Sequence, residues 1–296
     1  MFSLLNVSPV VETVQSRDVL VPDWTFVPST PWRGAFAHRL KATLTGRRPP
    51  PEQHILKRPV PRSRWVLYFA YLPDGIVTPA HRFTLEKLAQ LDAGLFVVCA
   101  VPSGAMVPST IYDYADAVAS KSLNGFDFSA YALGLRSIVA DSPGCDVFVI
   151  NDSVLGPFTD LDDEFASAPW DFTGYTAQSM IENHIQSYAF IVKNVDARVE
   201  RALRPVLPVD YAYDRYKDVI FQQETRLARV ASQHMSVGAK WFSDSTANVD
   251  PSFFCALSLI EGGFPFLKKS LLHRRPDIYD RTAIVEILEH LGHPRP

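Results

Sequence analysis

The sequence predicts an α/β fold built on a mainly parallel sheet. Three short apolar runs, at residues 65–71, 95–101 and 147–150, are too short for helices and too apolar for surface strands. Runs of this kind are typical of central strands that are buried on both faces. Segments with helical patterns separate them, and such an alternation indicates parallel strands joined by right-handed crossovers.

The composition is that of an ordinary globular protein. Hydrophobic residues make up 47% of the 296 residues and the formal net charge is -3, so the overall charge does not indicate binding to nucleic acid. A chain of this length can bury a large core without disulfides or metals. Cys99, Cys145 and Cys255 lie far apart within apolar runs, which favours buried thiols over a disulfide framework or a metal cluster.

We expect a cytoplasmic protein that is at most peripheral at the inner face of the plasma membrane. The amino terminus lacks a basic segment followed by an apolar run. No window reaches the roughly 18 apolar residues that a membrane span needs. Three cysteines without a pairing pattern agree with a reducing compartment.

Residues 1–64 are predicted to be a basic, Pro-rich extension that is at best partly ordered, followed by one domain at 65–296. Lys and Arg are frequent between residues 33 and 64, where Glu52 is the one acidic residue. Residues 32–41 could form a short basic amphipathic helix on anionic lipid. The alternative, which we favour, is a solvated basic linker. Membrane contact through residues 32–64 is therefore an open expectation.

Turn and helix signals follow the first two strands. Thr78 is predicted to cap a helix in which Pro79 takes the first position. After the second strand, turn residues at 124–127 lead into a helix at about 128–139. Asp127 is the expected cap of this helix.

The second half of the chain is predicted to complete the sheet and to add helices. Strands are expected at 172–176 and 186–192. The clearest helix lies at 216–235, where one face is apolar, and Gly238 is expected to end it. At about 100° per residue, Glu224 falls at the edge of that apolar face, so its carboxylate borders the buried side.

The polar triplet Asn151-Asp152-Ser153 follows the third apolar run directly. In an open α/β sheet, ligands bind at the carboxyl ends of the strands, where a carboxylate can reach a metal or a sugar hydroxyl. Asn, Asp and Ser also favour plain turns, because their side chains bond to nearby backbone. Spacing alone favours the turn, and Asp152 is the leading candidate if the triplet is functional.

Several common site motifs are absent from the sequence. It contains no G-x-G-x-x-G, G-x-x-x-x-G-K-[ST], G-x-S-x-G, H-E-x-x-H or paired C-x-x-C pattern. The expectation therefore moves away from dehydrogenases, P-loop NTPases, serine hydrolases and zinc enzymes.

Four segments occur together in an order and spacing that one family shares. They are 124–131 (NGFDFSAY), 149–158 (VINDSVLGPF), 172–176 (FTGYT) with 184–188 (HIQSY), and 263–269 (GFPFLKK). With these segments, the chain from about residue 65 to residue 272 resembles the rhamnan synthesis protein F family of bacterial polysaccharide glycosyltransferases. One departure is Leu123, which stands two places before the glycine where the family usually has Asn.

The resemblance implies a GT-A-like nucleotide-sugar fold. A sugar, often rhamnose, would pass from a nucleoside diphosphate to a growing glycan or a lipid-linked acceptor. The leaving diphosphate must be neutralised, either by a divalent metal such as Mg²⁺ or Mn²⁺ on oxygen ligands or by Lys and Arg. Asp152 is the expected metal ligand, although one carboxylate makes a thin site, and Lys268 is the expected cation. The alternative for Lys268 is a solvated surface lysine.

The resemblance also implies roles for further residues. Inversion at the anomeric carbon needs a base, for which Glu224 is the choice; its alternative is a helix carboxylate that pairs with Lys217 or Arg226. Asp152 is expected to share in catalysis. The residues expected on the donor side are Tyr71, Asp74, Asp127, Asn151, Asp152, Ser153 and Lys268, and those on the acceptor side are Asp171, His184 and Gln186.

Two other functions stay open. A single carboxylate in Asn151-Asp152-Ser153 is compatible with a non-catalytic binding or scaffold protein on a degenerate glycosyltransferase fold. A different transferase or a hydrolase could also use the carboxylates on a sugar or a phosphate ester.

Overall fold

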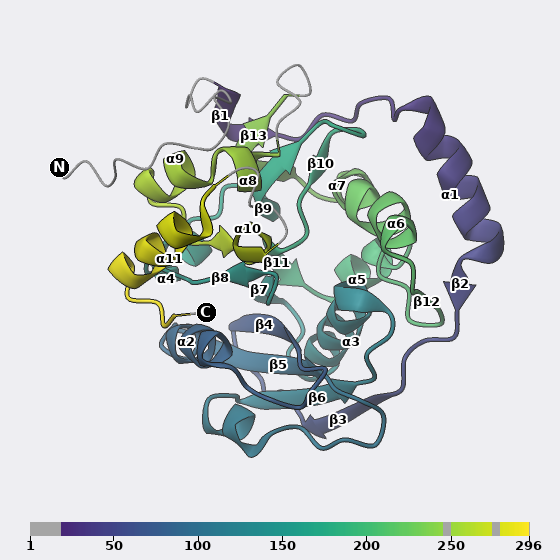
Figure 1. Ribbon diagram of the computed structural model, residues 1–296. Coiled ribbons are helices and arrows are strands. Elements are labelled where there is room, and N and C mark those ends of the chain that lie inside the picture. Colours follow the sequence, from purple (N-terminus) through teal and green to yellow (C-terminus); the bar gives the residue numbers. More distant parts are fainter. Residues whose placement is uncertain (1–18, 245–249, 274–278, 296) are drawn as a thin grey trace.

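One large sheet runs through the computed structural model, which describes residues 19–244, 250–273 and 279–295 (Figure 1). The described strands of this sheet follow the order β1-β13-β9-β11-β7-β4-β5-β6-β3, and β10 pairs with β9. In chain order they are β1 (Leu20–Thr25), β3 (Gln53–Lys57), β4 (Arg64–Tyr71), β5 (Gly94–Ala100), β6 (Ala117–Lys121), β7 (Cys145–Asn151), β9 (Phe172–Gln178), β10 (His184–Ile185), β11 (Ala189–Val195) and β13 (Val237–Ser243).

Most strands of the sheet share one direction. β4 is parallel to β5 and β7, β5 is parallel to β6, and β13 is parallel to β9. The exceptions are β11, which is antiparallel to β7 and β9, the short strand β10, which is antiparallel to β9, and the outer strands β1 and β3. The carboxyl ends of the parallel strands therefore meet at one edge of the sheet, and the predicted mainly parallel α/β fold is confirmed.

Helices cover both faces of the sheet because the central strands are apolar on both sides. In β4, Trp65 and Leu67 face one core and Val66 and Tyr68 face the other. The first core includes α3 (Phe126–Asp141), α5 (Ala197–Leu203) and α7 (Thr225–Ala231). The second includes α2 (Pro79–Leu88), α4 (Asp162–Ala166) and α9 (Ala256–Glu261), on the opposite face in Figure 1.

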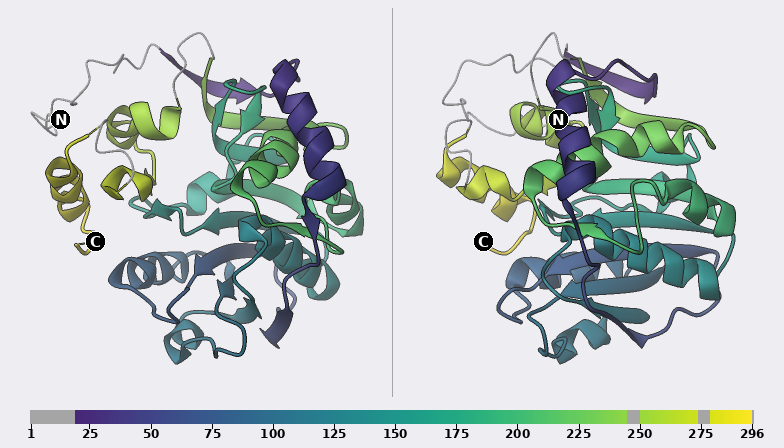
Figure 2. Two further views of the ribbon diagram at one scale, coloured as in Figure 1. Left: turned by 45° about the vertical axis from the view of Figure 1, so that its right-hand side comes forward. Right: turned by 90° about the vertical axis from the view of Figure 1, so that its right-hand side faces the viewer.

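The chain before β4 is part of this sheet, so the prediction of a partly ordered extension is wrong for residues 19–64. β1 pairs with β13 at one edge and β3 pairs with β6 at the other. Between them, α1 (Arg33–Thr45) lies outside α6 (Tyr216–Val219) and α7 (Figure 2), and β2 (Arg47–Arg48) pairs with β12 (Ala212–Tyr213). Residues 1–18 lie outside the described residues. Strands at an edge are largely exposed, so they lack the apolar runs of buried strands.

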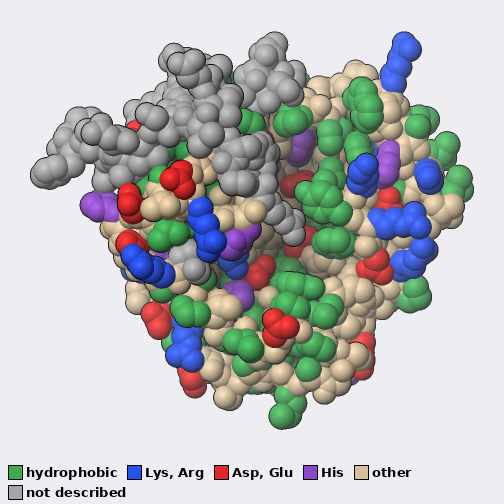
Figure 3. Space-filling view, in the orientation of Figure 1, with side chains coloured by type: hydrophobic (Ala, Val, Ile, Leu, Met, Phe, Trp, Pro, Cys, Tyr) green, Lys and Arg blue, Asp and Glu red, His purple; other side chains and the backbone are tan. Residues whose placement is uncertain are grey.

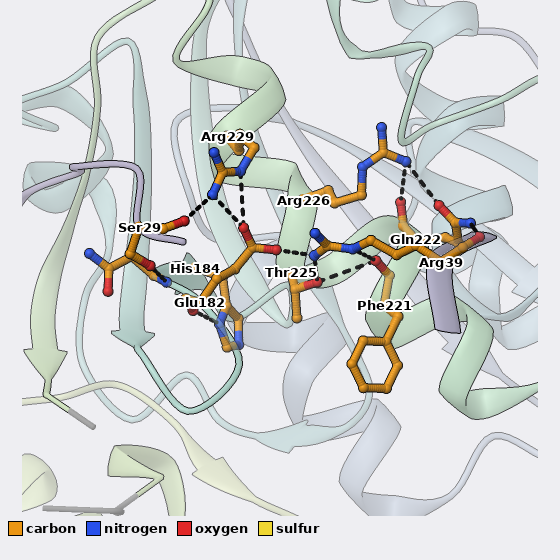
Figure 4. Close-up of polar contacts among 10 residues, drawn as sticks. Ser29, Arg39, Glu182, His184, Phe221, Gln222, Thr225, Arg226 and Arg229 are labelled. Atoms are coloured by element: carbon orange, nitrogen blue, oxygen red, sulfur yellow. Dashed lines mark hydrogen bonds and ion pairs between the residues drawn. The ribbon is translucent and has the colours of Figure 1, made fainter. Parts of the chain in front are cut away.

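A buried carboxylate attaches α1 to the rest of the chain (Figure 4). The side chain of Glu182 is fully buried and forms ion pairs with Arg39 of α1 and with Arg229 of α7, the latter over 2.6 Å between Oε2 and Nη2. Arg39 also donates to Thr225 Oγ1 at 2.8 Å and to the carbonyl oxygen of Phe221 at 2.8 Å. The segment predicted as a solvated linker is therefore the helix α1, which specific bonds attach to Glu182, Phe221 and Thr225.

The long predicted helix at 216–235 contains an irregular turn. It consists of α6, a π-helical turn at Ile220–Glu224 and α7. Such turns are frequent at functional sites, and this one ends at Glu224. Gly238 does not end the helix; it lies in β13, where an added Cβ atom would come within 2.3 Å of the Trp170 ring. Close packing against an indole, rather than a helix stop, explains this glycine.

The remaining described elements are short. They are the 3₁₀ helix at Ser109–Asp113, β8 (Val154–Leu155), α8 (Pro251–Phe254), β14 (Leu267–Lys268), α10 (Ser270–His273) and α11 (Arg281–His290). Within the described ranges, no helix combines the length and the apolar character that crossing a membrane requires.

Replacing Glu182 by Gln should destabilise the fold, because two guanidinium groups would lose their buried counter-charge. We expect a loss of roughly 3 kcal/mol in the free energy of unfolding, measured by urea denaturation. The matched variant Glu200→Gln should have little effect, since Glu200 pairs with a half-exposed Arg204. Equal stability of the Glu182 variant and the unmodified chain would contradict the role of Glu182 as the buried counter-charge of Arg39 and Arg229.

Candidate functional site

A cleft of about 1170 Å³ opens where the carboxyl ends of the parallel strands meet. Figure 3 shows a hollow on this face with acidic side chains inside it. The ends of β4, β7 and β9 contribute to its lining, together with the start of α3, the π-helical turn and β14. Of the predicted site residues, the cleft brings together Tyr71, Asp127, Asn151, Asp152, Ser153, His184, Gln186, Glu224 and Lys268.

Asn151 is the structural centre of the polar triplet. Its amide nitrogen donates to Asp127 Oδ2 at 2.7 Å and to the Tyr131 hydroxyl at 2.8 Å. Its amide oxygen accepts from the backbone nitrogen of Ser153 at 3.0 Å and from the Ser153 hydroxyl at 2.6 Å. Because these bonds occupy both ends of the amide, Asn151 orients its neighbours and has little capacity left for a ligand.

Asp152 is fixed to the end of β4 and to the first turn of α2 by two donors on one oxygen. Oδ2 accepts from the backbone nitrogen of Tyr71 at 3.0 Å and from His81 Nε2 at 3.1 Å. The other ring nitrogen of His81 accepts from the backbone nitrogen of Thr78 at 3.3 Å, so Nε2 carries the proton. Sequence reasoning missed His81, although its position three residues after the predicted cap Thr78 places it in the first turn of α2.

Two carboxylates in the cleft lining, those of Asp127 and Glu224, interact electrostatically. Glu224 Oε1 accepts from the backbone nitrogen and the hydroxyl of Ser187, at 3.2 and 3.3 Å. Burial, followed by the negative charge of Glu224, raises the pKa of Asp127 to about 6. Arg226 donates to Gln222 instead of pairing with Glu224. Glu224 is thus held at the cleft by Ser187, as an acceptor that is not neutralised by Arg226.

Two lysines, one at the end of β14 and one directly after it, approach the triplet. Lys268 pairs with Val154 across the strands β14 and β8, and the backbone nitrogen of Lys269 donates to the carbonyl oxygen of Ser153 at 2.9 Å. The ammonium nitrogen of Lys268 lies 4.0 Å from the centre of the Tyr188 ring and 3.4 Å from Ser153 Oγ. Burial lowers the pKa of both lysines. Lys268 is therefore a constrained cation of the cleft and not a solvated surface residue.

The wall formed by β9, β10 and α8 is a network of side-chain bonds. Gln186 donates to both oxygens of Asp250, at 3.2 and 3.1 Å, and accepts from the Thr176 hydroxyl at 2.6 Å. His184 Nδ1 bonds to the carbonyl oxygen of Glu182 at 2.7 Å. Asp250, which also caps α8, was not among the predicted site residues; its one signal in the sequence is the capping pattern Asp250-Pro251.

Two predicted site residues lie outside the cleft lining. Asp171 precedes β9, whose carboxyl end lines the cleft, so it lies at the opposite edge of the sheet. There it accepts from the backbone nitrogen and hydroxyl of Ser236, and these bonds lower its pKa. Asp74 is exposed in the turn after β4. Asp127 is not the cap of α3 either, because Gly125, with a φ of 80°, takes that position.

The described residues do not form a metal site from protein side chains alone. Among residues 19–244, 250–273 and 279–295, no group of three or more His, Cys, Asp or Glu is placed to hold a metal ion. Mg²⁺ is often held by one or two carboxylates together with substrate phosphates, so the surroundings of the predicted ligand Asp152 decide the fit. Asp152 has Tyr71 and His81 on one oxygen, with the ammonium group of Lys269 3.8 Å away.

Comparison with known proteins identifies related sequences. Residues 96–292 match the family described as rhamnan synthesis protein F. Over 135 residues, the chain is 27% identical to "Virulence protein VirA" of Vibrio anguillarum. That match covers 44% of this chain and 42% of VirA, so it spans less than half of the length of this relative.

The comparison with solved structures gives weak matches, of which two follow. A protein from Desulfovibrio desulfuricans G20, named as a nucleotide-diphospho-sugar transferase, has 13% identity and a TM-score of 0.36, with 77% of this chain and 96% of that chain covered. Residues 1–349 of S. aureus TarS, in complex with UDP, have 13% identity and a TM-score of 0.36, with 79% and 73% covered. Likeness at this level says nothing about the substrate of this chain.

The raised pKa of Asp127 makes a prediction about stability and pH. A carboxyl group with a raised pKa binds its proton more tightly in the folded state, so its contribution to stability falls as the pH rises from about 4 to about 6. The unmodified chain should lose roughly 1–3 kcal/mol relative to Asp127→Asn between pH 4 and pH 7, measured by urea denaturation.

The variant Asp171→Asn is the matched control. In the unmodified chain, the pKa of Asp171 is lowered in the folded state. The contribution of Asp171 to stability should therefore be retained between pH 4 and pH 7 and be lost only at lower pH. Parallel stability curves for the unmodified chain and Asp127→Asn would contradict the raised pKa.

Proposed function

Because the chain belongs to the rhamnan synthesis protein F family, we propose that it transfers a sugar from a nucleoside-diphosphate sugar to a polysaccharide. The observation that carries this proposal is that ammonium and carboxylate groups line one cleft. Lys268 and Lys269 lie beside the Asn151-Asp152-Ser153 triplet. Asp127 accepts from Asn151, and Glu224 is close enough to raise the pKa of Asp127. Ammonium groups suit a diphosphate, and a carboxylate suits an acceptor hydroxyl that must lose a proton.

Donor binding is proposed for the residues around the triplet. Tyr71 ends β4 at the cleft with 43% of its surface exposed, so its ring is available to stack on a nucleobase. Ser153 and the remaining oxygen of Asp152 can bond to sugar or ribose hydroxyls. Asn151 supports both residues through its own bonds.

The chemical step is proposed as a displacement with inversion. The acceptor hydroxyl oxygen forms the new bond to the anomeric carbon, and its proton passes to the Glu224 carboxylate. The bond between the anomeric carbon and the diphosphate oxygen breaks, and the electron pair leaves with the nucleoside diphosphate. Glu224 suits the base better than Asp250, since Ser187 bonds only to Oε1 of Glu224, whereas Gln186 and Ser252 hold Asp250.

The donor and the acceptor are proposed at the level of class. The family description names rhamnan, so a nucleoside-diphosphate rhamnose is the first donor to test. The acceptor is proposed to be a growing or lipid-linked glycan.

Glu224→Gln tests the proposed base. It should bind the nucleotide sugar as the unmodified chain does but lower the rate of nucleoside diphosphate release with a glycan acceptor by about 10²–10⁴-fold. The exposed Glu261→Gln serves as the matched control and should retain the rate. An unchanged rate in the Glu224 variant would contradict Glu224 as the base and would assign that role to another residue. Failure of the unmodified chain to bind any nucleotide sugar favours the non-catalytic scaffold.

The outer face of α1 is proposed to lie on an anionic membrane. Phe36, Leu40 and Leu44 are four residues apart and form an apolar row, with 68%, 55% and 75% of their surfaces exposed. Exposed Arg33 and Lys41 are on the same helix. No Asp or Glu occurs from residue 26 to residue 51. Apolar side chains beside exposed basic residues match the interface of a bilayer that contains anionic lipid.

This surface can be tested by vesicle sedimentation. The chain should bind vesicles that contain phosphatidylglycerol and not vesicles of phosphatidylcholine alone. Phe36→Ser/Leu40→Ser/Leu44→Ser should weaken binding about tenfold or more. Ile76→Ser/Met106→Ser, which removes exposed apolar side chains elsewhere, should not. Vesicle binding that is unchanged in the triple variant would contradict the membrane contact. So would a dimer of the unmodified chain that becomes monomeric in the triple variant.

A further inference from the structure

Lys268 of β14 and Lys269, which follows that strand, are held at the cleft by backbone bonds. Lys268 lies opposite Val154 in the β14–β8 pair, and Lys269 is bonded through its backbone nitrogen to Ser153. Val154 and Ser153 follow Asp152 directly. Backbone bonds thus hold both residues next to the triplet, and from there their ammonium groups reach Ser153 and Asp152.

The ammonium group of Lys268 lies in an environment that suits a bound anion. The described ion pairs give Lys268 no carboxylate partner within 4.0 Å; its neighbours are the Tyr188 ring and Ser153 Oγ. The negative charges of Glu224, Asp250 and Asp127 act on it, but the effect of burial is larger and lowers its pKa. A partly buried cation without a close counter-charge has an unmet electrostatic demand, which a phosphate oxygen satisfies.

The ammonium group of Lys269 is a second cation next to the Asn151-Asp152-Ser153 triplet. Its ammonium nitrogen lies 3.8 Å from Asp152 Oδ2, which already accepts from Tyr71 and His81. A divalent cation on Asp152 would have to stand against the positive charge of Lys269. Because Tyr71 and His81 already occupy this oxygen and an ammonium group stands beside it, the surroundings of Asp152 favour anion binding over metal binding.

We propose that Lys268 and Lys269 together take up the charge of the donor diphosphate, so that donor binding does not depend on a divalent cation. This inference rests on the proposed function and goes beyond it, because it assigns the task of the expected metal to two amino groups. In the transfer step, the diphosphate leaves with the electron pair of the broken bond, and the two ammonium groups stabilise its added charge.

The test is calorimetry with UDP, dTDP, GDP and CDP, carried out in EDTA and again with Mg²⁺ or Mn²⁺. The nucleoside diphosphate that binds should have the same Kd in both conditions within about a factor of two. Lys268→Met and Lys269→Met should each weaken binding about 10- to 100-fold, as expected for loss of a charge-assisted hydrogen bond. Lys268→Arg should retain most of the affinity, which separates loss of charge from misfolding.

Lys217→Met is the matched control, since it removes an exposed lysine and the same charge outside the cleft lining. It should bind as the unmodified chain does. Binding that appears only with a divalent cation, or that survives in both Met variants, overturns the inference and leaves the proposed function intact. No binding of any nucleoside diphosphate in either condition overturns both.

Discussion

The side chain of Asn151 links the parts on which the cleft depends. Its amide holds Asp127 from α3 and Ser153 from the turn after β7, while the next residue, Asp152, is tied to β4 through Tyr71. These bonds lie at the one edge of the sheet where polar groups of several strands converge. The central strands β4, β5 and β7 are mainly apolar on both faces, which favours placing the chemistry where strands end.

The central strands could be predicted because burial on both faces leaves a continuous apolar run. β6 and β13 could not be. β6 ends in Lys121, a lysine with 1% exposure whose ammonium group donates to the carbonyl oxygen of Asn124 at 2.8 Å, and β13 contains Gly238. A buried cation and a glycine both interrupt the expected pattern, although each is explained by a specific contact in the fold.

The cleft was predictable in part for the same reason. Asp152 and Ser153 follow a buried strand, and their placement at its carboxyl end is a consequence of the parallel sheet. His81 and Lys269 contact Asp152 from segments 71 and 117 residues away in sequence, so no local pattern reveals them. Asp171 lies outside the cleft lining because it precedes the amino end of its strand, at the opposite edge of the sheet.

The segment before β4 also decides which strands end the sheet. β1 and β3 cover β13 and β6, and both are poor partners for another sheet: β1 contains Pro22 and the positive-φ residue Asp23, and the pairing of β3 shifts register between Ile55 and Lys57. Prolines and irregular register hinder edge-to-edge association. A chain that began at residue 65 would expose the regular edges of β6 and β13, so residues 19–64 protect the fold against aggregation through its own sheet.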